Sequence, residues 1–429
     1  MPFFMKCRRC RFSVHQPLGQ AGAILAASIA LLSCGPGASS EASGLGTTFA
    51  ELREVPPPTG RGSMTPYLSA GREGTVYLSW QEPDETGHAV RMAELSASGW
   101  SEPHTIARGE DFFVNWADFP SIVELPDGSL AAHWLQREGP RTYAYGVRIA
   151  RSADGGETWS DPVTPHLDGT LTEHGFVSLF PAVDGALAVV WLDGRNFAEP
   201  ADDGPLDGDM SLRYAQIGVD GAPRNQTLLD ARACDCCQTS AALTSEGPVL
   251  VYRDRSEGEI RDISVVRLVG SEWTAPATIH ADGWYMPACP VNGPAVAAKD
   301  ERVAVAWYTG ANEVPKVQVA FSGDAGKTFG EPIRVDEGTP LGRVDAMLLD
   351  DGAALVVWLE TTARGAAVRA RRVRPDGEAS VPATVALTDV SRSSGFPRMT
   401  ALGNDVILAW TDTGPDGSVR AVIATLPLD

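Results

Sequence analysis

Apolar residues recur along the chain in short blocks that each end in an aromatic side chain. The seven blocks end at Trp80, Trp134, Trp191, Tyr252, Trp307, Trp358 and Trp410. The spacings between successive members, from their residue numbers, are 54, 57, 61, 55, 51 and 52 residues. Self-similarity at a fixed period is typical of repeat architectures, in which each unit packs on its neighbours. The pattern therefore predicts one large domain, although 429 residues could hold two or three ordinary ones.

Each repeat contains several short apolar segments separated by turns. In the second repeat these segments are residues 120–125, 130–135 and 145–151, with glycine or aspartate in the turns between them. The segments with the aromatic residue are nearly continuous in apolar residues, as expected of strands that are covered on both faces. Four short strands per repeat are the sequence form of a β-propeller blade. We therefore predict an all-β fold, a single β-propeller of four-stranded blades.

The number of blades follows from counting the strands. Seven aromatic strands and seven first strands are present, but the last repeat ends after its third strand, residues 419–426. Residues 47–55 precede the first repeat and are not assigned to any blade. They could supply the missing fourth strand and so close the ring, which would remove both exposed edges. The sequence favours seven blades closed by an N-terminal strand, with six as the alternative.

Two turns between third and fourth strands carry a second pattern, S-x-D-x-G-x-T-[WF], at residues 152–159 and 322–329. This pattern resembles the Asp box of BNR repeats, and the chain thus resembles the sialidase-like propeller superfamily, in which six blades are expected. An Asp side chain accepts backbone N–H bonds within such a turn, and Gly adopts a backbone conformation that other residues resist. We interpret these residues as structural: Asp154, Gly156, Trp159, Asp324, Gly326 and Phe329.

The N-terminal segment has the pattern of an export signal. Basic residues end at Arg11, an apolar run fills residues 21–32, and Cys34 follows directly after Ser33. The order resembles a bacterial lipobox, which implies that residues 1–33 are removed, that Cys34 is lipidated and that residues 34–46 form a flexible tether to a propeller at 47–429. Gly35 favours the outer membrane as the site of this lipid anchor in the cell envelope. The alternative is an ordinary secretory peptide with an incidental cysteine.

The net charge argues against one class of partner. The chain has 35 Lys and Arg residues against 55 Asp and Glu residues, a formal charge of −20. An anionic surface repels phosphate backbones, so we expect no nucleic-acid partner. A glycan, a peptide or another small molecule remains as a ligand.

In a propeller the starts of the first strands meet at one face, where polar groups converge into a candidate site. The most specific group is Cys234-Asp-Cys236-Cys237, with Cys289 at the corresponding position of the next repeat. Three interpretations stay open. The thiols form disulfides, including one between the adjacent Cys236 and Cys237; they bind copper or zinc together with His174 or Met286; or one of them is a redox or catalytic thiol.

The resemblance to sialidases implies three arginines that hold a carboxylate, a Tyr nucleophile assisted by Glu, and an Asp acid. The corresponding candidates here are Asp118, Arg253, Tyr308, Arg343, Glu360 and Arg398. The F-R-I-P motif of sialidases is absent, since residues 61–64 read R-G-S-M. Trp116, Trp284 and Tyr285 are candidates for stacking on sugar rings. The acidic loop Asp202–Asp209 is a candidate calcium site, although it lacks EF-hand spacing.

The sequence leaves three functions open. The first is a lipid-anchored envelope propeller that binds a ligand at the channel mouth. The second is an exo-glycosidase of sialidase type. The third is a thiolate metal-binding or redox propeller.

Overall fold

The structure, a computed structural model, describes residues 45–197, 208–414 and 417–427. These ranges belong to one compact unit, Ser43–Asp429. Cys34, the export signal, most of the expected tether and residues 202–207 of the expected calcium loop lie outside the described residues. Within the described ranges, no helix has the length and apolar character needed to cross a membrane.

Seven antiparallel sheets follow one another along the chain and are numbered here as blades 1 to 7. Blades 1 to 3 are β2 (Met64–Ala70), β3 (Val76–Asp84), β4 (Gly87–Ser96), β5 (Gly99–Trp100) and β6 (His104–Gly109); β7 (Ser121–Glu124), β8 (Leu130–Arg137) and β9 (Tyr145–Ser152); and β10 (His174–Pro181), β11 (Leu187–Asp193), β12 (Ser211–Ile217) and β13 (Pro223–Asp230). Blades 4 and 5 are β14 (Ser240–Thr244), β15 (Gly247–Arg253), β16 (Ile263–Val269), β17 (Glu272–Trp273) and β18 (Ala277–His280); and β19 (Ala295–Lys299), β20 (Arg302–Thr309), β21 (Lys316–Ser322) and β22 (Ile333–Arg334). Blades 6 and 7 are β23 (Pro340–Leu348), β24 (Ala354–Thr362), β25 (Gly365–Val373) and β26 (Ala383–Thr388); and β27 (Arg398–Leu402), β28 (Asp405–Asp412), β29 (Ser418–Thr425) and β1 (Glu51–Glu54). Short 3-10 turns occupy Arg72–Gly74, Val183–Gly185, Ala311–Glu313 and Arg392–Ser394.

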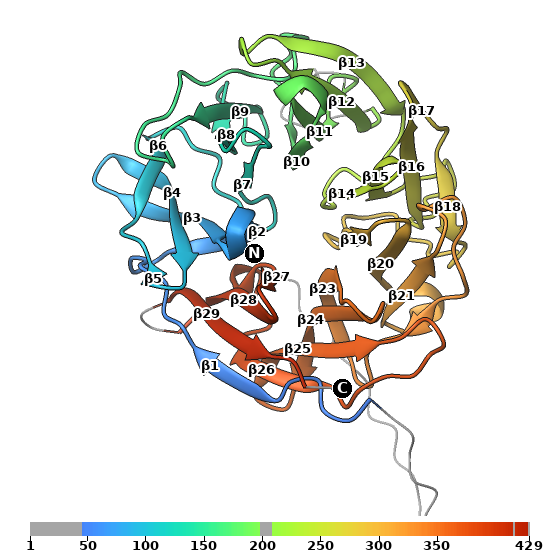
Figure 1. The fold of residues 1–429 in the computed structure, drawn as a ribbon. Coiled ribbons are helices and arrows are strands. Elements are labelled where there is room, and N and C mark those ends of the chain that lie inside the picture. The colour runs from blue at the N-terminus through green and yellow to red at the C-terminus, as the bar shows by residue number, and fades with distance from the viewer. Residues whose placement is uncertain (1–44, 198–207, 415–416, 428–429) are drawn as a thin grey trace, which may run out of the picture. The chain divides into compact units, whose positions relative to one another are not determined.

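The first strand of every blade faces a common axis (Figure 1). Each of these inner strands contacts the inner strand of the next blade, from β2 through β7, β10, β14, β19 and β23 to β27, which contacts β2 again. The contacts therefore close a ring, and the prediction of a seven-bladed propeller is confirmed. The alternative of six blades, which the sialidase resemblance implied, is wrong because each of the seven aromatic strands lies in a sheet of its own.

The ring is closed by the N-terminal strand, as predicted. Strand β1 pairs antiparallel with β29, with Glu51 opposite Thr425 and Glu54 opposite Val422. It thereby becomes the outermost strand of blade 7 (Figure 1). Just before it, the buried Thr48 hydroxyl is 2.7 Å from Ser380 Oγ of blade 6. The first and last parts of the described chain thus complete the same blade.

Fourth strands are the least regular part of the blades. In blades 1 and 4 the third strand pairs with two short strands in turn, first β5 or β17 and then β6 or β18. In blade 2 the fourth position is taken by a single bridge between Ile149 and Val163. Outer strands contribute less to the core, so their pairing tolerates such breaks.

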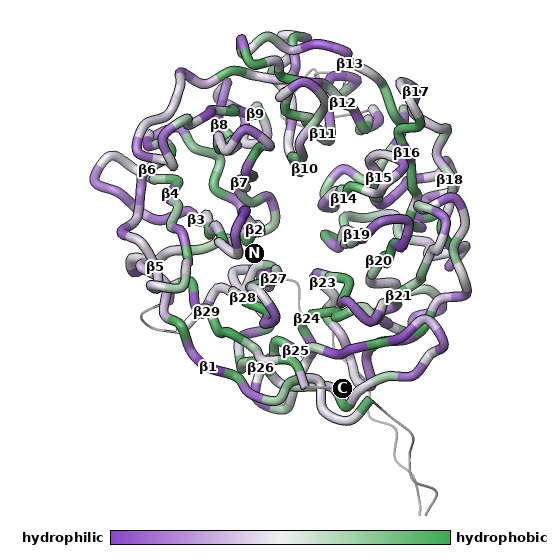
Figure 2. The backbone as a smooth tube through the Cα atoms, viewed as in Figure 1, coloured by the Kyte–Doolittle hydropathy of each residue, from purple (hydrophilic) through white to green (hydrophobic). Residues whose placement is uncertain are grey.

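The core consists of seven apolar clusters, one between each pair of neighbouring blades. The aromatic residues that mark the repeat lie in these clusters, and Trp80, Trp191, Tyr252 and Trp358 have no exposed surface. Hydrophobic stretches run through the interior of the blades, and many outer turns are hydrophilic (Figure 2). Because every blade is covered on both faces, its second strand needs apolar residues at successive positions. This requirement explains the continuous apolar blocks of the sequence.

Strand alternation assigns the loops to two faces. Loops that lead into first strands, and loops between second and third strands, open on one face, here called the mouth face. Turns between third and fourth strands lie on the opposite face. The predicted site residues therefore belong to the mouth face, and the two Asp-box turns do not.

Candidate functional site

Residues 115–119, here called the plug segment, lead into β7 and lie across the mouth of the central channel. The ring of Trp116 stacks on Phe396 of blade 7, with a centroid distance of 5.9 Å. The ring of Phe119 stacks on Tyr67 of blade 1 at 5.8 Å. A segment of blade 2 thus touches blade 1, next to it, and blade 7, two positions away around the ring.

Arg343 secures one side of the plug segment. Its guanidinium carbon lies 4.6 Å from the centroid of the Trp116 ring, a cation–π distance. Its Nη1 donates to the carbonyl oxygens of Ser391 at 3.1 Å and Gly395 at 3.2 Å. Burial lowers the pKa of Arg343 to about 10. These contacts give Arg343 a packing role between blades 6, 7 and 2, which explains its position at a first-strand start.

Asp118, within the plug segment, and Arg398 connect this segment to other blades. Asp118 is 2% exposed and accepts the backbone N–H of Phe176 at 2.8 Å. Burial raises the pKa of Asp118 to about 7, against the lowering effect of that hydrogen bond. Arg398 lies 4.1 Å from the Phe119 ring and 3.5 Å from Asp345. Both candidates for catalysis are therefore used to join neighbouring blades.

A pocket of about 530 Å³ lies beside the plug segment on the mouth face. Its walls come from blades 2, 3, 4, 5 and 7, so the convergence of distant loops expected from the repeat is realised here. The lining residues are Asn115, Trp116, Ala117, Tyr143, Tyr145, Glu173, Phe176, Phe197, Gly208, Asp235, Cys236, Arg255, Cys289, Val291 and Arg392. Tyr143 is 55% exposed and presents an accessible aromatic face.

Two carboxyl groups of the pocket have different environments. Burial, together with the charges of Asp235 and Asp118, raises the pKa of Glu173 to about 8. No hydrogen bond or ion pair to the Glu173 carboxyl group occurs among the described residues. Asp235 is instead 3.5 Å from Arg255 Nη1 and 3.6 Å from Arg261 Nη1. At neutral pH the pocket thus combines a protonated carboxylic acid with an ion-paired carboxylate.

A larger hollow of about 900 Å³ lies on the opposite face, between blades 3 and 4. Among the described residues, Glu246 is the only carboxylate in its lining, and this side chain is paired with Lys327 at 2.8 Å and Arg267 at 3.5 Å. The smaller mouth pocket has the denser set of titratable groups and is therefore the better candidate site.

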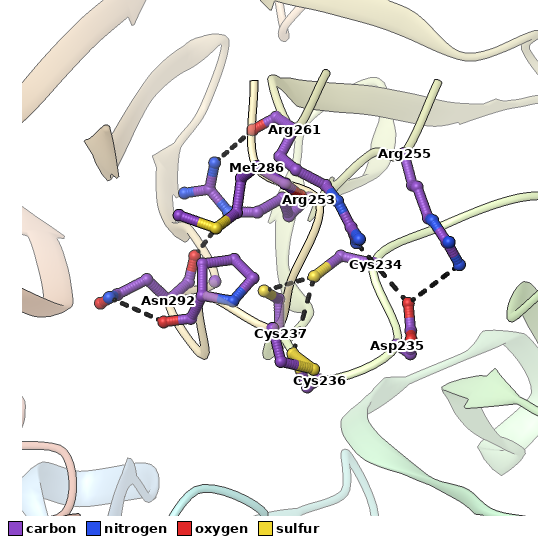
Figure 3. The surroundings of a disulfide bond; sticks show 12 residues. Cys234, Asp235, Cys236, Cys237, Arg253, Arg255, Arg261, Met286 and Asn292 are labelled. Atoms are coloured by element: carbon purple, nitrogen blue, oxygen red, sulfur yellow. Dashed lines mark hydrogen bonds and ion pairs between the residues drawn. A yellow bond between two sulfur atoms is a disulfide. The ribbon is translucent and has the colours of Figure 1, made fainter. Parts of the chain in front are cut away.

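The cysteines of blades 4 and 5 meet at the edge of the mouth pocket. Cys236 forms a disulfide with Cys289, 53 residues further along the chain. This bond joins the two loops that lead into the neighbouring blades 4 and 5. The adjacent pair considered from the sequence, Cys236 with Cys237, is not formed. Cys234 and Cys237 are free thiols, and their sulfur atoms lie 2.7 Å apart (Figure 3). A thiolate metal site with three of these cysteines would require the disulfide to open.

His174 does not join the cysteines. It lies between two carboxylates, with its Nε2 3.2 Å from Asp168 and 3.7 Å from Asp193, and its ring stacks on His166 at 3.9 Å. Burial lowers the pKa of His174, but the hydrogen bond to Asp168 and the charge of Asp193 outweigh it, so the pKa is raised. Arg195 pairs with the same two carboxylates, at 3.1 and 2.7 Å. The cluster is a buried ion-pair network of blade 3.

This network is poorly suited to a metal ion, although His166, Asp168 and His174 come close together. The Nε2 of His166 accepts the backbone N–H of Val147 at 3.1 Å, so the Nδ1 that faces Asp168 carries the proton. Burial and the nearby His174 lower the pKa of His166 to about 3. The ring is therefore neutral, and it has no lone pair to offer on the side of Asp168.

Three further predicted residues form a second packing unit, away from the pocket. The Arg253 side chain is 1% exposed, and it donates to the carbonyl oxygens of Asn292 at 2.7 Å and Tyr308 at 2.6 Å. Its guanidinium group covers the Trp284 ring at 4.8 Å, the Tyr308 ring meets the same indole edge-on, and Trp284 is 5% exposed. Trp284 thus has no free face for a sugar. Tyr285 is 63% exposed but does not line the pocket.

The remaining candidates are also placed by the structure. Glu360 bonds to Trp358 and Arg369 within blade 6. In the Asp-box turn of blade 2, Asp154 accepts the N–H of Thr158 at 2.9 Å, and these bonds lower the pKa of Asp154 to about 2. The turn of blade 5 repeats this geometry, with 2.9 Å between Asp324 and the Thr328 nitrogen. The side chains of Trp159 and Phe329 pack against the apolar clusters between blades.

The set of arginines that a sialidase requires is therefore not assembled around the mouth pocket. Asn115 was among the positions expected at the mouth, but sequence reasoning missed other polar or aromatic residues that line the pocket, namely Tyr143, Glu173, Phe197, Arg255 and Arg392. Several of these are next to positions that were singled out, as Glu173 is next to His174. Others lie in loops between second and third strands, whose conformation the repeat does not specify.

No protein-family model matches the chain, and no curated protein matches its sequence. Among solved structures, an ulvan lyase bound to GlcA(1-4)Rha3S has a TM-score of 0.58 and 12% identity, covering 87% of this chain and 96% of that chain. A Dyadobacter fermentans protein of unknown function has a TM-score of 0.49 and 14% identity, with 88% and 99% covered. A NanB sialidase variant from Streptococcus pneumoniae has a TM-score of 0.46 and 10% identity, with 87% and 94% covered. At these identities the likeness concerns the fold alone.

Proposed function

We propose that the protein binds a carbohydrate in the mouth pocket. The observation that carries this proposal is the combination of an accessible aromatic ring, Tyr143, with uncharged and charged hydrogen-bonding groups on one concave wall. Sugar rings present an apolar face that packs on aromatic side chains, and their hydroxyl groups bond to amides, carboxyl groups and guanidinium groups. Asn115, Glu173 and Arg255 offer these three kinds of group.

The architecture accommodates such a ligand. The volume of about 530 Å³ lies within the usual range of small-molecule pockets, roughly 300–1,000 Å³. The ulvan lyase of similar fold is itself bound to a sugar unit, but that likeness supports only the fold. The proposal therefore depends on the side chains of this pocket.

The location of this activity follows from the N-terminal pattern. We propose that Cys34 carries a lipid anchor and that the propeller is displayed on the bacterial cell envelope, in the outer membrane. A glycan of the envelope or its surroundings would then meet the mouth face. Mass spectrometry of the N-terminal peptide purified from membranes tests this part, and an unmodified Cys34 would contradict it.

Binding is tested with the purified protein and a panel of immobilised oligosaccharides, both neutral and acidic. Hits are then measured by calorimetry with the free sugar. We expect Tyr143→Ala to weaken binding about two- to tenfold, since aromatic contacts typically contribute about 0.5–1.5 kcal/mol. Tyr285→Ala is the matched control, because Tyr285 is also largely exposed but lies outside the pocket. Equal losses in both variants, or no binding to any sugar, would reject the proposal.

A second candidate function is catalysis on the bound sugar. It is favoured by the pair Glu173 and Asp235, because a protonated and an ionised carboxyl group at one site are what acid-catalysed cleavage of a glycosidic bond requires. Glu173→Gln should then abolish turnover while binding persists. Activity of the wild type should fall as the pH rises through about 8, where Glu173 loses its proton.

The sialidase reaction is the specific form of this candidate that the sequence resemblance suggested. Hydrolysis of a fluorogenic sialoside that is lost in Arg343→Ala would support it. Because Arg343 also packs on Trp116, thermal stability of that variant must be measured in parallel. Loss of hydrolysis with an unchanged melting temperature would assign Arg343 a role in catalysis.

A further inference from the structure

Four sulfur atoms form a continuous series at the edge of the mouth pocket (Figure 3). Cys289 is bonded to Cys236. Cys236 Sγ lies 3.9 Å from Cys234 Sγ, and Cys234 Sγ lies 2.7 Å from Cys237 Sγ. Thiol–disulfide exchange proceeds by attack of one sulfur on another, so sulfur atoms in contact can pass a disulfide along the series.

The two ends of the series differ in access to solvent. Cys289 is exposed and Cys236 is half-buried, and both line the pocket. Cys234 and Cys237 are each 1% exposed. An external thiol or disulfide can therefore reach the outer pair, Cys236 and Cys289, but not the inner pair, Cys234 and Cys237.

The inner pair has a chemically distinct environment. Burial raises the pKa of both thiols, but for Cys237 the hydrogen bond from Cys234 and the charge of Arg253 outweigh it, so its pKa is lowered. The pKa of Cys234 is raised well above its usual value by burial and by its neighbour Cys237. The two sulfur atoms lie next to the buried guanidinium groups of Arg253 and Arg261, and the positive charge of Arg253 favours the thiolate form of Cys237. A thiol whose pKa is lowered in this way converts more readily to the thiolate, which is the form that takes part in exchange.

We propose that the four cysteines form a thiol–disulfide relay, in which the buried pair exchanges electrons with external thiols and disulfides through Cys236 and Cys289. The external reactant is a low-molecular-weight or protein disulfide, RS–SR, or in the reverse direction the corresponding thiol. The inner pair stores two electrons as a dithiol and gives them up as a Cys234–Cys237 disulfide.

The oxidation proceeds in balanced steps. Cys234 loses its proton to solvent and attacks Cys236, and the Cys236–Cys289 bond breaks to release Cys289 as a thiolate. This thiolate attacks RS–SR, which forms Cys289–SR and releases RS⁻. Cys237 loses its proton and attacks Cys234, so that the Cys234–Cys237 bond forms and Cys236 is released as a thiolate. Cys236 then attacks Cys289–SR, restores the original disulfide and releases the second RS⁻. In total the two RS⁻ take up the protons released by Cys234 and Cys237, so one RS–SR becomes two RSH and two thiols become one disulfide.

The test uses the folded protein in glutathione buffers of graded redox ratio. Samples are quenched with acid, free thiols are alkylated, and each cysteine is assigned by peptide mass spectrometry. We expect the inner pair to change between alkylated and disulfide-bonded forms as the ratio changes, while the wild-type outer pair stays bonded. Mixed disulfides with glutathione should appear on Cys289 or Cys236 only. Direct modification of Cys234 or Cys237, or an inner pair insensitive to the ratio, would overturn the proposal.

Two variants that lack the same disulfide distinguish a relay from exchange that occurs because the loops open. Cys236→Ser removes the sulfur that contacts Cys234, and we expect exchange of the inner pair to slow at least about tenfold. Cys289→Ser loses the same covalent link but keeps Cys236, so exchange should continue. Equal rates in the two variants would show that local opening exposes the inner pair, and the relay would be rejected.

Metal analysis of protein purified without reductant gives an independent check that does not depend on the variants. We expect less than one equivalent of copper or zinc and a bonded outer pair. One equivalent of metal with all four cysteines reduced would replace the relay by a thiolate metal site.

Discussion

The indole nitrogen of Trp358 donates a hydrogen bond of 3.1 Å to the carboxylate of Glu360, two residues further along β24. Arg369, directly opposite Trp358 on β25, lies 3.7 Å from the same carboxylate. Blades 1 and 3 repeat this arrangement with Trp80, Glu82 and Arg91, and with Trp191, Asp193 and Arg213. Glu82, Asp193 and the catalytic candidate Glu360 thus satisfy the indole N–H groups of these three tryptophans. We call this arrangement the Trp–carboxylate clamp.

Removing the acid of one clamp should destabilise the propeller. In Glu360→Ala the Trp358 indole N–H loses its partner, and an unsatisfied buried donor costs about 1–3 kcal/mol. Glu337→Ala is the control, because Glu337 is 61% exposed in its ion pair with Arg371 and such pairs contribute about 0–1 kcal/mol. Chemical denaturation midpoints measure both effects. A loss in Glu360→Ala no larger than in the control would show that the clamp is incidental.

The segments that lead into the inner strands of blades 4 and 5 approach so closely that Gly293 has no room for a side chain. A Cβ atom at this position would lie 2.1 Å from the backbone oxygen and 2.6 Å from the backbone nitrogen of Gln238. Gly293→Ala should therefore lower the free energy of unfolding by about 3 kcal/mol or more, since backbone atoms cannot move aside locally. At Gly323 a Cβ would meet nothing within 4 Å, and Gly323→Ala should change stability by less than about 0.5 kcal/mol. Thermal unfolding of the two variants checks the contrast.

Closure by β1 should be needed for a stable, monomeric propeller. Deletion of residues 1–55 removes β1 and leaves the edge of β29 unpaired. We expect a lower melting temperature and self-association, because an unpaired strand edge is a template for pairing with another chain. Deletion of residues 1–44 keeps β1 and Thr48 and serves as the control. Size-exclusion chromatography measures self-association of the two proteins, and calorimetry measures their melting temperatures. The same oligomeric state and melting temperature in both would contradict the closure argument.

Glu173 makes stability depend on pH in a defined direction. Its pKa is about 8 in the folded protein, above the ordinary value of 4.5. A group with a raised pKa contributes stability that is fully present when the pH is below its pKa in the unfolded state. This stability is lost as the pH rises through its pKa in the folded state. Glu173→Gln mimics the protonated form, so the variant should match the wild type at pH 4 and be the more stable protein at pH 9.

The melting temperature from pH 4 to 9 tests this dependence. In a domain of this size, a difference of about 1 kcal/mol in the free energy of unfolding should shift the melting temperature by roughly 2–4 °C or somewhat less. Glu331→Gln, an exposed position, should show the same pH dependence as the wild type. A wild type more stable than Glu173→Gln at pH 9 would mean that Glu173 is ionised and stabilised by an attractive charge.

The sequence by itself determined the architecture. Each aromatic strand must be apolar on both faces because it is covered by two neighbouring blades, so the repeat at Trp80, Trp191 and Trp358 could be read directly as a number of blades. The missing last strand and the unassigned residues 47–55 predicted how the ring closes, because an unpaired strand edge must be covered. The Asp-box turns followed from local hydrogen bonds, which need only neighbouring residues.

The tertiary structure decided what the polar residues do. Arg343 and Trp116 are far apart in the sequence, and only the diameter of the closed ring brings the guanidinium group onto the indole. The pairing of Cys236 with Cys289, and not with Cys237, likewise depends on how two blades sit beside each other. The side chains that line the mouth pocket come from loops of five blades, and a repeat fixes where such loops start but not their conformation. Periodic burial is a property of the chain, whereas contacts across the mouth are a property of the assembled ring.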